Sequence, residues 1–339
     1  SQQAEQYASD EGSFAVLTND PAAPEGVREE LRRAADAARE AYRGVARALR
    51  EEFAPGARES DACGIDDYRL HLASFLGARL DPREVYDWAV QQLLELDAEQ
   101  RRIAEQIQPG ASIPEAMAAL TADPARQLHS PEELQAWMQR LSDAALDTLA
   151  DTHFEITEPM RELECRIAPT HDGVIYYTPP SGDFTRPGRM WWSVPENVSQ
   201  HATWEETTTV YHEGVPGHHL QIATALANAG ELNRWRRMGI WVSGHGEGWA
   251  LYAERLMAEL GFLDDPGDRM GMLDSQRLRT VRVIFDVGFH CGFEIPEVLG
   301  DLLGGARAGE TWTPDDGWAF LRHNVVMADS VLRFEWLRY

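Results

Sequence analysis

Hydrophobic positions in the first half of the chain recur at the spacing of amphipathic helices. Within residues 24–53 the apolar positions are Leu31, Ala35, Ala38, Tyr42, Val45 and Leu49, a period typical of one helical face. Residues 81–110 carry a second, longer helical pattern, and Ser130 is predicted to cap a third helix because Glu133 follows it. Residues 1–23 show no such period, and we expect an irregular lead-in.

The middle of the chain carries a different pattern. Residues 174–177 and 190–194 are short aromatic and β-branched runs, and turn-rich segments lie between them. This arrangement is typical of short strands joined by turns. We therefore predict a small hairpin or meander within residues 163–200.

Helical spacing returns after this region, and it predicts helices at about residues 204–228, 232–261, 268–291 and 314–339. Together the patterns indicate a mainly α, multi-helical fold with a small β-sheet. We divide the chain into the lead-in 1–23, a helical subdomain 24–160 and a subdomain 161–339 that carries the candidate chemistry. The last two are expected to form one continuous globular unit.

The composition excludes several classes of protein. Hydrophobic residues make up 43% of the 339 positions, enough for a large core, so the chain is not disordered. The formal net charge of −25 argues against nucleic acid and anionic membranes as partners, because both require a basic face. No apolar run approaches the length of a membrane span. Three widely spaced cysteines form no disulfide framework, which favours a reducing compartment, and we expect a cytoplasmic protein.

One short segment concentrates groups suited to metal chemistry. Residues 211–221 read YHEGVPGHHLQ and contain His212, Glu213, His218 and His219. Imidazole and carboxylate are ligands that zinc prefers, and a hydrolase needs a base beside the water that the metal activates. The pattern differs from the usual H-E-x-x-H helix because Pro216 stands where the second histidine is expected.

The spacing of the histidines constrains the backbone between them. In an unbroken helix His218 would face away from His212, and His219 would lie roughly 10 Å farther along the axis. Pro216 removes a helical hydrogen bond and Gly217 relaxes the backbone, so we predict a distorted turn, in the form of a two-residue bulge, that brings His218 to His212. We prefer His218 to His219 as the second ligand, with His219 in a supporting position.

A third ligand is expected from residues 244–254, which read GHGEGWALYAE. Glu247 and Glu254 are seven positions apart and share an inward helical face, where a carboxylate is costly unless it is paired or metal-bound. The glycines on both sides of Glu247 allow close approach of the backbone. We assign Glu247 as the third ligand and Glu254 as the residue that orients a ligand histidine.

A polar stripe crosses the apolar helix predicted at residues 268–291. Arg282, Asp286 and His290 are each four residues apart, so they stack on one side of that helix. The stripe is either a structural network or a substrate clamp. In a clamp, Arg282 would hold a carboxylate and His290 would donate to a developing oxyanion, with Asp286 in support.

The two motifs resemble those of a bacterial family, domain of unknown function 885. HEGVPGHHLQ at 212–221 and EGWALYAE at 247–254 match its hallmarks, and RPG at 186–188, R-x-x-x-D-x-G-x-H at 282–290 and E-x-x-R-Y at 335–339 agree with it. That family is similar to carboxypeptidase Taq and thimet oligopeptidase, which are zinc peptidases. The resemblance implies a zincin-like metallopeptidase fold, with a β-sheet edge beside the active-site helix on which Tyr177 would contact an extended substrate. It also implies further segments at both ends of the chain.

The sequence therefore predicts a zinc-dependent hydrolase, most simply a carboxypeptidase or dipeptidase acting on short peptides. The expected Zn²⁺ ligands are His212, His218 and Glu247, and the expected general base is Glu213. The candidates for stabilising the oxyanion are Tyr211, His290 and Tyr339, of which Tyr339 would also contact substrate. Two alternatives stay open, because the motif does not specify the scissile bond. One is an amide hydrolase or lyase acting on a small metabolite, and the other is a non-catalytic, metal-stabilised binding protein.

Overall fold

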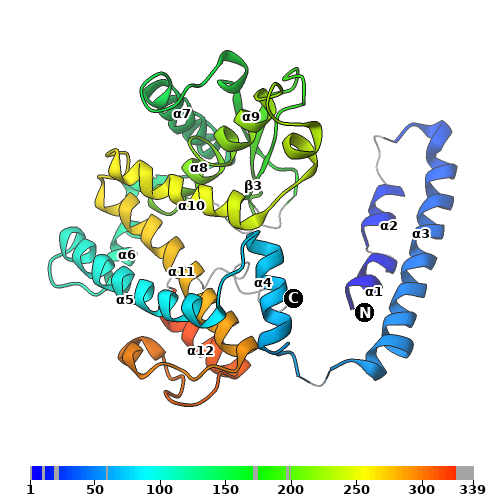
Figure 1. Cartoon of the computed structure of the whole chain (residues 1–339). Helices are drawn as coiled ribbons and strands as arrows, with labels where there is room; N and C mark the ends of the chain where they lie inside the picture. Colours follow the sequence, from blue (N-terminus) through cyan, green and yellow to red (C-terminus); the bar gives the residue numbers. More distant parts are fainter. Residues whose placement is uncertain are drawn as a thin grey trace. The chain divides into compact units, whose positions relative to one another are not determined.

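The computed structural model describes residues 2–9, 12–18, 23–58, 60–170, 175–195, 198 and 200–325. The chain divides into two compact units, Ser1–Asp61 and Ala62–Tyr339 (Figure 1). This division falls inside the residues that the sequence pattern assigned to a helical subdomain.

The first unit is a long helix with two short helices packed on it. It contains α1 (Gln2–Ala8), α2 (Ser13–Thr18), η1 (Glu25–Val27), α3 (Arg28–Ala48), η2 (Leu49–Phe53) and η3 (Ala54–Gly56). The expectation of an irregular lead-in was wrong for the helical residues of α1 and α2. Tyr7 and Phe14 pack on Tyr42 of α3 with ring centroids 5.2 and 5.5 Å away. Each short helix offers too few residues for a hydrophobic period to be visible in the sequence.

The second unit is mainly helical, as predicted. Its first part contains α4 (Ile65–Leu76), α5 (Pro82–Ile107), α6 (Ile113–Ala122), η4 (Pro124–Arg126), α7 (Pro131–Leu149) and η5 (Glu158–Met160). The predicted cap of α7 is confirmed, because Ser130 Oγ accepts a hydrogen bond from the Glu133 backbone N–H at 3.1 Å. Asp81 caps α5 in the same manner. These caps satisfy N–H groups that a helix start leaves unpaired.

Two small sheets lie between the helical parts. β2 (Leu163–Ile167), β3 (Ile175–Thr178) and β4 (Gly188–Trp192) form one sheet in the order β2-β4-β3, and β1 (Gln127–Leu128) pairs with β5 (His201–Ala202). The antiparallel β3–β4 pair is the predicted hairpin. Strand β2 runs parallel to β4, so the described sheet is not a meander.

The later helices surround the segment with the candidate chemistry. They are α8 (Thr203–Glu213), α9 (His218–Ala227), η6 (Trp235–Gly239), α10 (Ser243–Glu259), α11 (Pro266–Cys291), η7 (Glu297–Leu303) and α12 (Pro314–Asn324). Helix α11 packs along α5 and α8, and α10 packs against α8 (Figure 1). Close packing of α11 on α8 depends on Gly271, where a Cβ would overlap the Trp204 carbonyl oxygen. The predicted helix 314–339 is observed as far as Asn324, and residues after 325 lie outside the described part.

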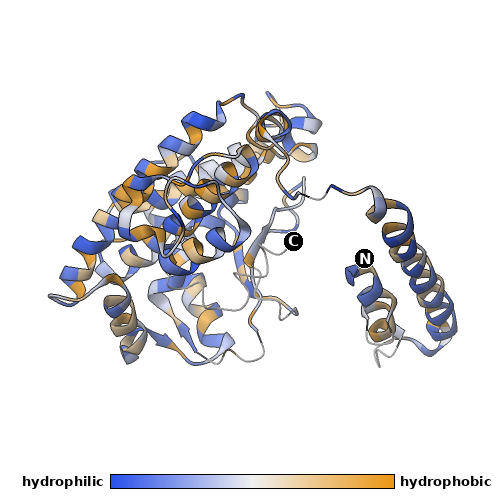
Figure 2. Ribbon diagram, turned by 90° about the horizontal axis from the view of Figure 1, so that it is seen from below, coloured by the Kyte–Doolittle hydropathy of each residue, from blue (hydrophilic) through white to orange (hydrophobic). Residues whose placement is uncertain are grey.

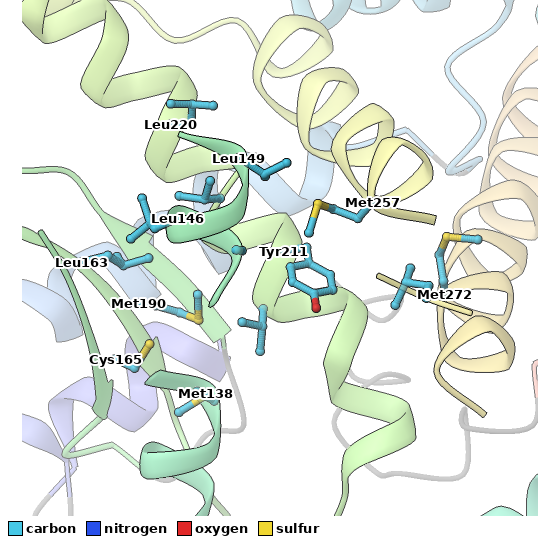
Figure 3. Packing of buried hydrophobic residues seen from close by; sticks show 14 of the residues in the cluster. Met138, Leu146, Leu149, Leu163, Cys165, Met190, Tyr211, Leu220, Met257 and Met272 are labelled. Atoms are coloured by element: carbon cyan, nitrogen blue, oxygen red, sulfur yellow. The ribbon is translucent and has the colours of Figure 1, made fainter. Parts of the chain in front are cut away.

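The hydrophobic core of the second unit fixes α8 from several sides. One cluster gathers Leu146, Leu149, Leu163, Met190, Leu220, Met257 and Met272 (Figure 3). Figure 2 shows hydrophobic and hydrophilic residues alternating along the helices, as amphipathic helices require. Across the described residues, none of the helices combines the length and the apolar character needed to cross a membrane.

Candidate metal centre

Three side chains from three helices converge at the junction of α8 and α9. His212 comes from α8, His218 from α9 and Glu247 from α10, and their candidate ligand atoms all lie within 4.8 Å of one another. His212 Nε2 is 3.4 Å and His218 Nε2 is 3.6 Å from Glu247 Oε2. Both imidazoles are buried, and Glu247 is half exposed.

A break in the helix brings the two histidines together. Helix α8 ends at Glu213, residues 214–217 form a turn, and α9 begins at His218. The rings of His212 and His218 lie 4.8 Å apart, nearly perpendicular to each other. The predicted distorted turn between the two histidines is present, and it takes the form of a four-residue turn that separates two helices instead of a two-residue bulge within one.

Hydrogen bonds from both sides hold this turn. The Gly217 N–H donates to the Tyr211 carbonyl at 3.0 Å, and the His219 N–H donates to the Gly214 carbonyl at 3.1 Å. From α10, Trp249 Nε1 donates to the Pro216 carbonyl at 2.7 Å. Trp249 was not predicted to take part, although it stands two residues after Glu247 in the helix that positions the carboxylate.

Gly217→Ala should disrupt this turn. An added Cβ would overlap the His212 and Tyr211 carbonyl oxygens, which are backbone atoms at the end of α8 and cannot move independently. We expect a loss of stability of at least about 1–3 kcal/mol, because overpacking here forces the backbone to shift. Zinc affinity should fall as well, since His218 follows Gly217 directly. Thermal unfolding and zinc titration measure the two effects.

Gly248→Ala is the matched control for this substitution. Gly248 adjoins Glu247 in α10, and an added Cβ would meet nothing within 4 Å. We expect unchanged or slightly higher stability, because alanine favours helix more than glycine does. Equal stability and zinc affinity in the Gly217→Ala and Gly248→Ala proteins would contradict the role of the turn.

Glu254 supports His212 from behind. Its Oε1 lies 2.7 Å from His212 Nδ1, and its Oε2 accepts a hydrogen bond from Thr208 Oγ1 at 2.6 Å. Burial lowers the pKa of His212, but its contacts with Glu247 and Glu254 outweigh burial and raise that pKa to about 9. Thr208 was not predicted, although it precedes His212 by one helical turn and so shares its face.

Glu254→Gln should weaken zinc binding by about 10- to 100-fold, the range typical of residues that hold a metal-ligating histidine. The amide keeps the volume of a side chain that is 1% exposed, so the change removes mainly the charge. Glu259→Gln, at the exposed end of the same helix, is the control. Competition with a zinc chelator measures both affinities, and equal values for the two variants would count against Glu254.

His219 faces a different set of neighbours. Its Nδ1 lies 2.8 Å from the Tyr177 hydroxyl and its Nε2 lies 2.8 Å from the Met160 carbonyl oxygen. Burial lowers the pKa of His219 to about 4. Gly188 leaves room for the contact, because a Cβ there would lie 2.5 Å from the Tyr177 hydroxyl oxygen. We expected His219 to support the ligand residues, and this was wrong. His219 links α9 to β3 through Tyr177 instead.

Glu213 lies next to the cluster at the end of α8. It is buried, and it lines the same pocket as His218 and Glu247. Burial raises the pKa of Glu213, while the neighbouring imidazoles of His212 and His218 oppose that rise. The carboxyl group is thus buried beside the two histidines.

The separations of Glu247 from the two candidate histidine ligands suit zinc. Nitrogen and oxygen donors at about 2.0–2.2 Å in a tetrahedron lie roughly 3.3–3.6 Å from one another. The two measured nitrogen–oxygen separations, 3.4 and 3.6 Å, fall in that range. The second ring nitrogen of His212 is held by a carboxylate, a common arrangement for metal-ligating histidines. His218 differs, because its Nδ1 is buried without a hydrogen-bond partner in the described chain.

A cavity of about 1260 Å³ opens on this cluster. Strand β3 contributes Tyr177 to its wall, and α11 contributes Arg279 and Arg282. The remaining wall is largely apolar and includes Ile222, Leu226, Met238, Ile240 and Trp241. Tyr177 and Arg282, which were predicted to contact substrate, both line this pocket, and so does Arg279, to which the sequence patterns assigned no role.

Other predicted site residues lie elsewhere. Tyr211 is 3% exposed in the core, with its ring 6.0 Å from that of Phe262 (Figure 3). It precedes His212 by one residue and so points to another side of α8, which excludes it as an oxyanion donor. Tyr339 lies outside the described residues.

Asp286 and His290 are not among the residues that line the pocket at the candidate metal centre. Asp286 accepts a hydrogen bond from the Tyr68 hydroxyl at 2.6 Å, and His290 Nε2 is 3.7 Å from Asp286. His290 Nδ1 accepts from the Cys63 backbone N–H. These two residues join α11 to the start of α4. The predictions that His290 donates to an oxyanion and that Asp286 supports the site were therefore wrong.

The fold is shared with solved bacterial structures. The structure entitled "The crystal structure of the putative lipoprotein from Colwellia psychrerythraea" has a TM-score of 0.72 and 24% identity over 96% of this chain and 55% of that chain. A putative lipoprotein of unknown function from Shewanella oneidensis has a TM-score of 0.57 and 15% identity over 99% of this chain and 63% of that chain. The chain thus spans less than two thirds of either structure.

The family assignment comes from the sequence. No curated protein matches this sequence. The whole of residues 1–339 matches the family described as "Bacterial protein of unknown function (DUF885)", as its two long motifs indicated. The chain therefore belongs to the DUF885 family of bacterial proteins.

Proposed function

We propose that this protein is a zinc-dependent hydrolase that cleaves amide bonds in short peptides. The observation that carries the proposal is the convergence of His212, His218 and Glu247, whose candidate ligand atoms all lie within 4.8 Å of one another, with Glu213 beside them. Zinc in this position supplies a Lewis acid that polarises the carbonyl and makes water easier to deprotonate.

Each residue of the site has a distinct task in this proposal. His212, His218 and Glu247 hold the ion, and Glu254 keeps the His212 ring in its orientation. Glu213 takes the proton from the attacking water and passes it to the departing amine. Its buried position in the same pocket wall as His218 and Glu247 suits that transfer, because a carboxyl group with a raised pKa can both accept and return a proton.

The pocket supports a peptide as the substrate. Strand β3 is at one edge of the sheet β2-β4-β3 and carries Tyr177 into the cavity wall. An exposed strand edge binds extended chains through backbone hydrogen bonds. The likeness to zincin-like peptidases, suggested by the motifs, is part of this proposal.

Chelator-sensitive digestion tests the proposal. The purified chain, supplied with zinc, should cleave members of a short-peptide library, and a chelator should stop cleavage until zinc is restored. Mass spectrometry of the products identifies the bonds cleaved. Stoichiometric zinc without cleavage of any peptide or small amide would favour a metal-stabilised binding protein instead.

A further inference from the structure

The pocket wall has a charge opposite to that of the chain. The chain carries a formal charge of −25, yet the described residues that line the pocket include four arginines and two glutamates. The arginines are Arg236, Arg237, Arg279 and Arg282. Glu247, one of the two carboxylates, lies within 3.6 Å of both histidines. The local excess of positive charge points to an anionic group in the ligand.

Arg282 is one arginine of this wall that is available to such a ligand. It is exposed toward the pocket, and within the described residues it has no hydrogen-bond or ion-pair partner at contact distance. The nearby Asp286 lies one helical turn away, but its carboxylate already accepts the Tyr68 hydroxyl. Although the residue as a whole is exposed, partial burial of its guanidinium group and the adjacent Arg279 both lower the pKa of Arg282, with Asp286 opposing them. A carboxylate bound here would relieve the repulsion between the two guanidinium groups.

Arg279 connects this position to the candidate metal centre. Its Nη2 lies 4.0 Å from Glu254 Oε1, the same oxygen that contacts His212. Arg279 and Arg282 are three residues apart on α11, so they share one face at a rise of about 4.5 Å. An anion between them would therefore lie in the same pocket as His218 and Glu247.

The walls beside the arginines favour an apolar side chain. Met238, Ile240 and Trp241 line the pocket, and each is about half exposed, at 52, 49 and 52%. From α9, Ile222 and Leu226 add to the apolar lining. The surface thus offers a guanidinium pair for a carboxylate and an apolar wall for the side chain next to it.

We infer that Arg282, assisted by Arg279, binds the free α-carboxylate of a peptide substrate whose last residue has an apolar side chain. The inference rests on the proposed function, and it assigns the substrate class: peptides cleaved at their C-terminal bond. Arg282 is a specificity-determining residue, since it contacts the terminal carboxylate and not the reacting atoms.

A matched pair of peptides tests the inference. The probes are N-benzoylglycyl-phenylalanine and its C-terminal amide, which differ only in the terminal charge. Calorimetric titration uses the zinc-supplied chain with Glu213→Gln, so that neither probe is consumed. We expect the free acid to bind at least about 10-fold more tightly than the amide, the range of a charge-assisted hydrogen bond.

Substitutions at Arg282 separate the charge from its geometry. Arg282→Gln should weaken binding of the free acid by about 10- to 100-fold and change binding of the amide little. Arg282→Lys should recover part of the loss, because it restores the charge without the planar fork. Arg140→Gln, an exposed arginine of α7, has the same change in net charge and should leave the preference intact. Circular dichroism verifies that each variant is folded.

The possible outcomes distinguish this inference from the proposed function. Equal binding of acid and amide, no binding of either, or an unchanged preference in Arg282→Gln would overturn it. Zinc-dependent hydrolysis of both probes at equal rates would overturn it while leaving the proposed function intact. A preference for the acid that depends on Arg282, without zinc-dependent hydrolysis by the wild-type chain, would support it and count against the proposed function.

Discussion

Glu213→Gln is expected to abolish hydrolysis while zinc stays bound. The amide has nearly the same size as the carboxylate but cannot accept the proton of water, so the rate should fall by about 10²- to 10⁴-fold. Glu213 is not among the three groups that converge as candidate ligands, and zinc content should therefore be unchanged. Metal analysis and initial rates on the same preparation measure both effects.

The Glu259→Gln protein is the control for this result, since it makes the same change at an exposed site. Loss of zinc from the Glu213→Gln protein would identify Glu213 as a ligand. Turnover equal to that of the control would remove Glu213 from the mechanism.

The second large effect is expected from the ligands themselves. His212→Ala and Glu247→Ala should each reduce zinc from one equivalent to a small fraction, because each leaves only two of three protein ligands. Activity should be lost together with the metal. Equilibrium dialysis followed by elemental analysis gives the stoichiometry of zinc.

His219→Ala separates metal loss from general damage to this region. It removes a fully buried imidazole that contacts Tyr177 and Met160 and lies in the same helix as His218. We expect lower stability but retained zinc. Full zinc retention in His212→Ala, or loss in His219→Ala equal to that in His212→Ala, would refute the ligand assignment.

Much of the architecture could be predicted from local signals. Hydrophobic periods located the long helices α5 and α11, and Ser130 marked the start of α7 because capping depends only on neighbouring residues. The antiparallel β3–β4 pair was predictable because two aromatic runs flank a turn-rich segment. The parallel pairing of β2 was not, since it joins strands that are not adjacent in the chain.

Contacts between segments that are distant in the chain also explain which site residues were misplaced. The break between His212 and His218 could be predicted, because in an unbroken helix neither His218 nor His219 could share one ion with His212. Periodicity shows which residues share a face but not what that face contacts. Arg282 reaches the pocket, whereas His290 lies eight residues, or about 12 Å, farther along α11 and meets Cys63 and Asp286 instead.

The most direct test of the central claim is the position of zinc in the folded protein. Crystals of the zinc-supplied chain, measured on both sides of the zinc absorption edge, reveal the ion through its anomalous scattering. We predict one strong peak within about 2.0–2.2 Å of His212 Nε2, His218 Nε2 and Glu247, with a side open toward the pocket. A peak on His219 with His218 turned away, or no peak among these three side chains, would contradict the account.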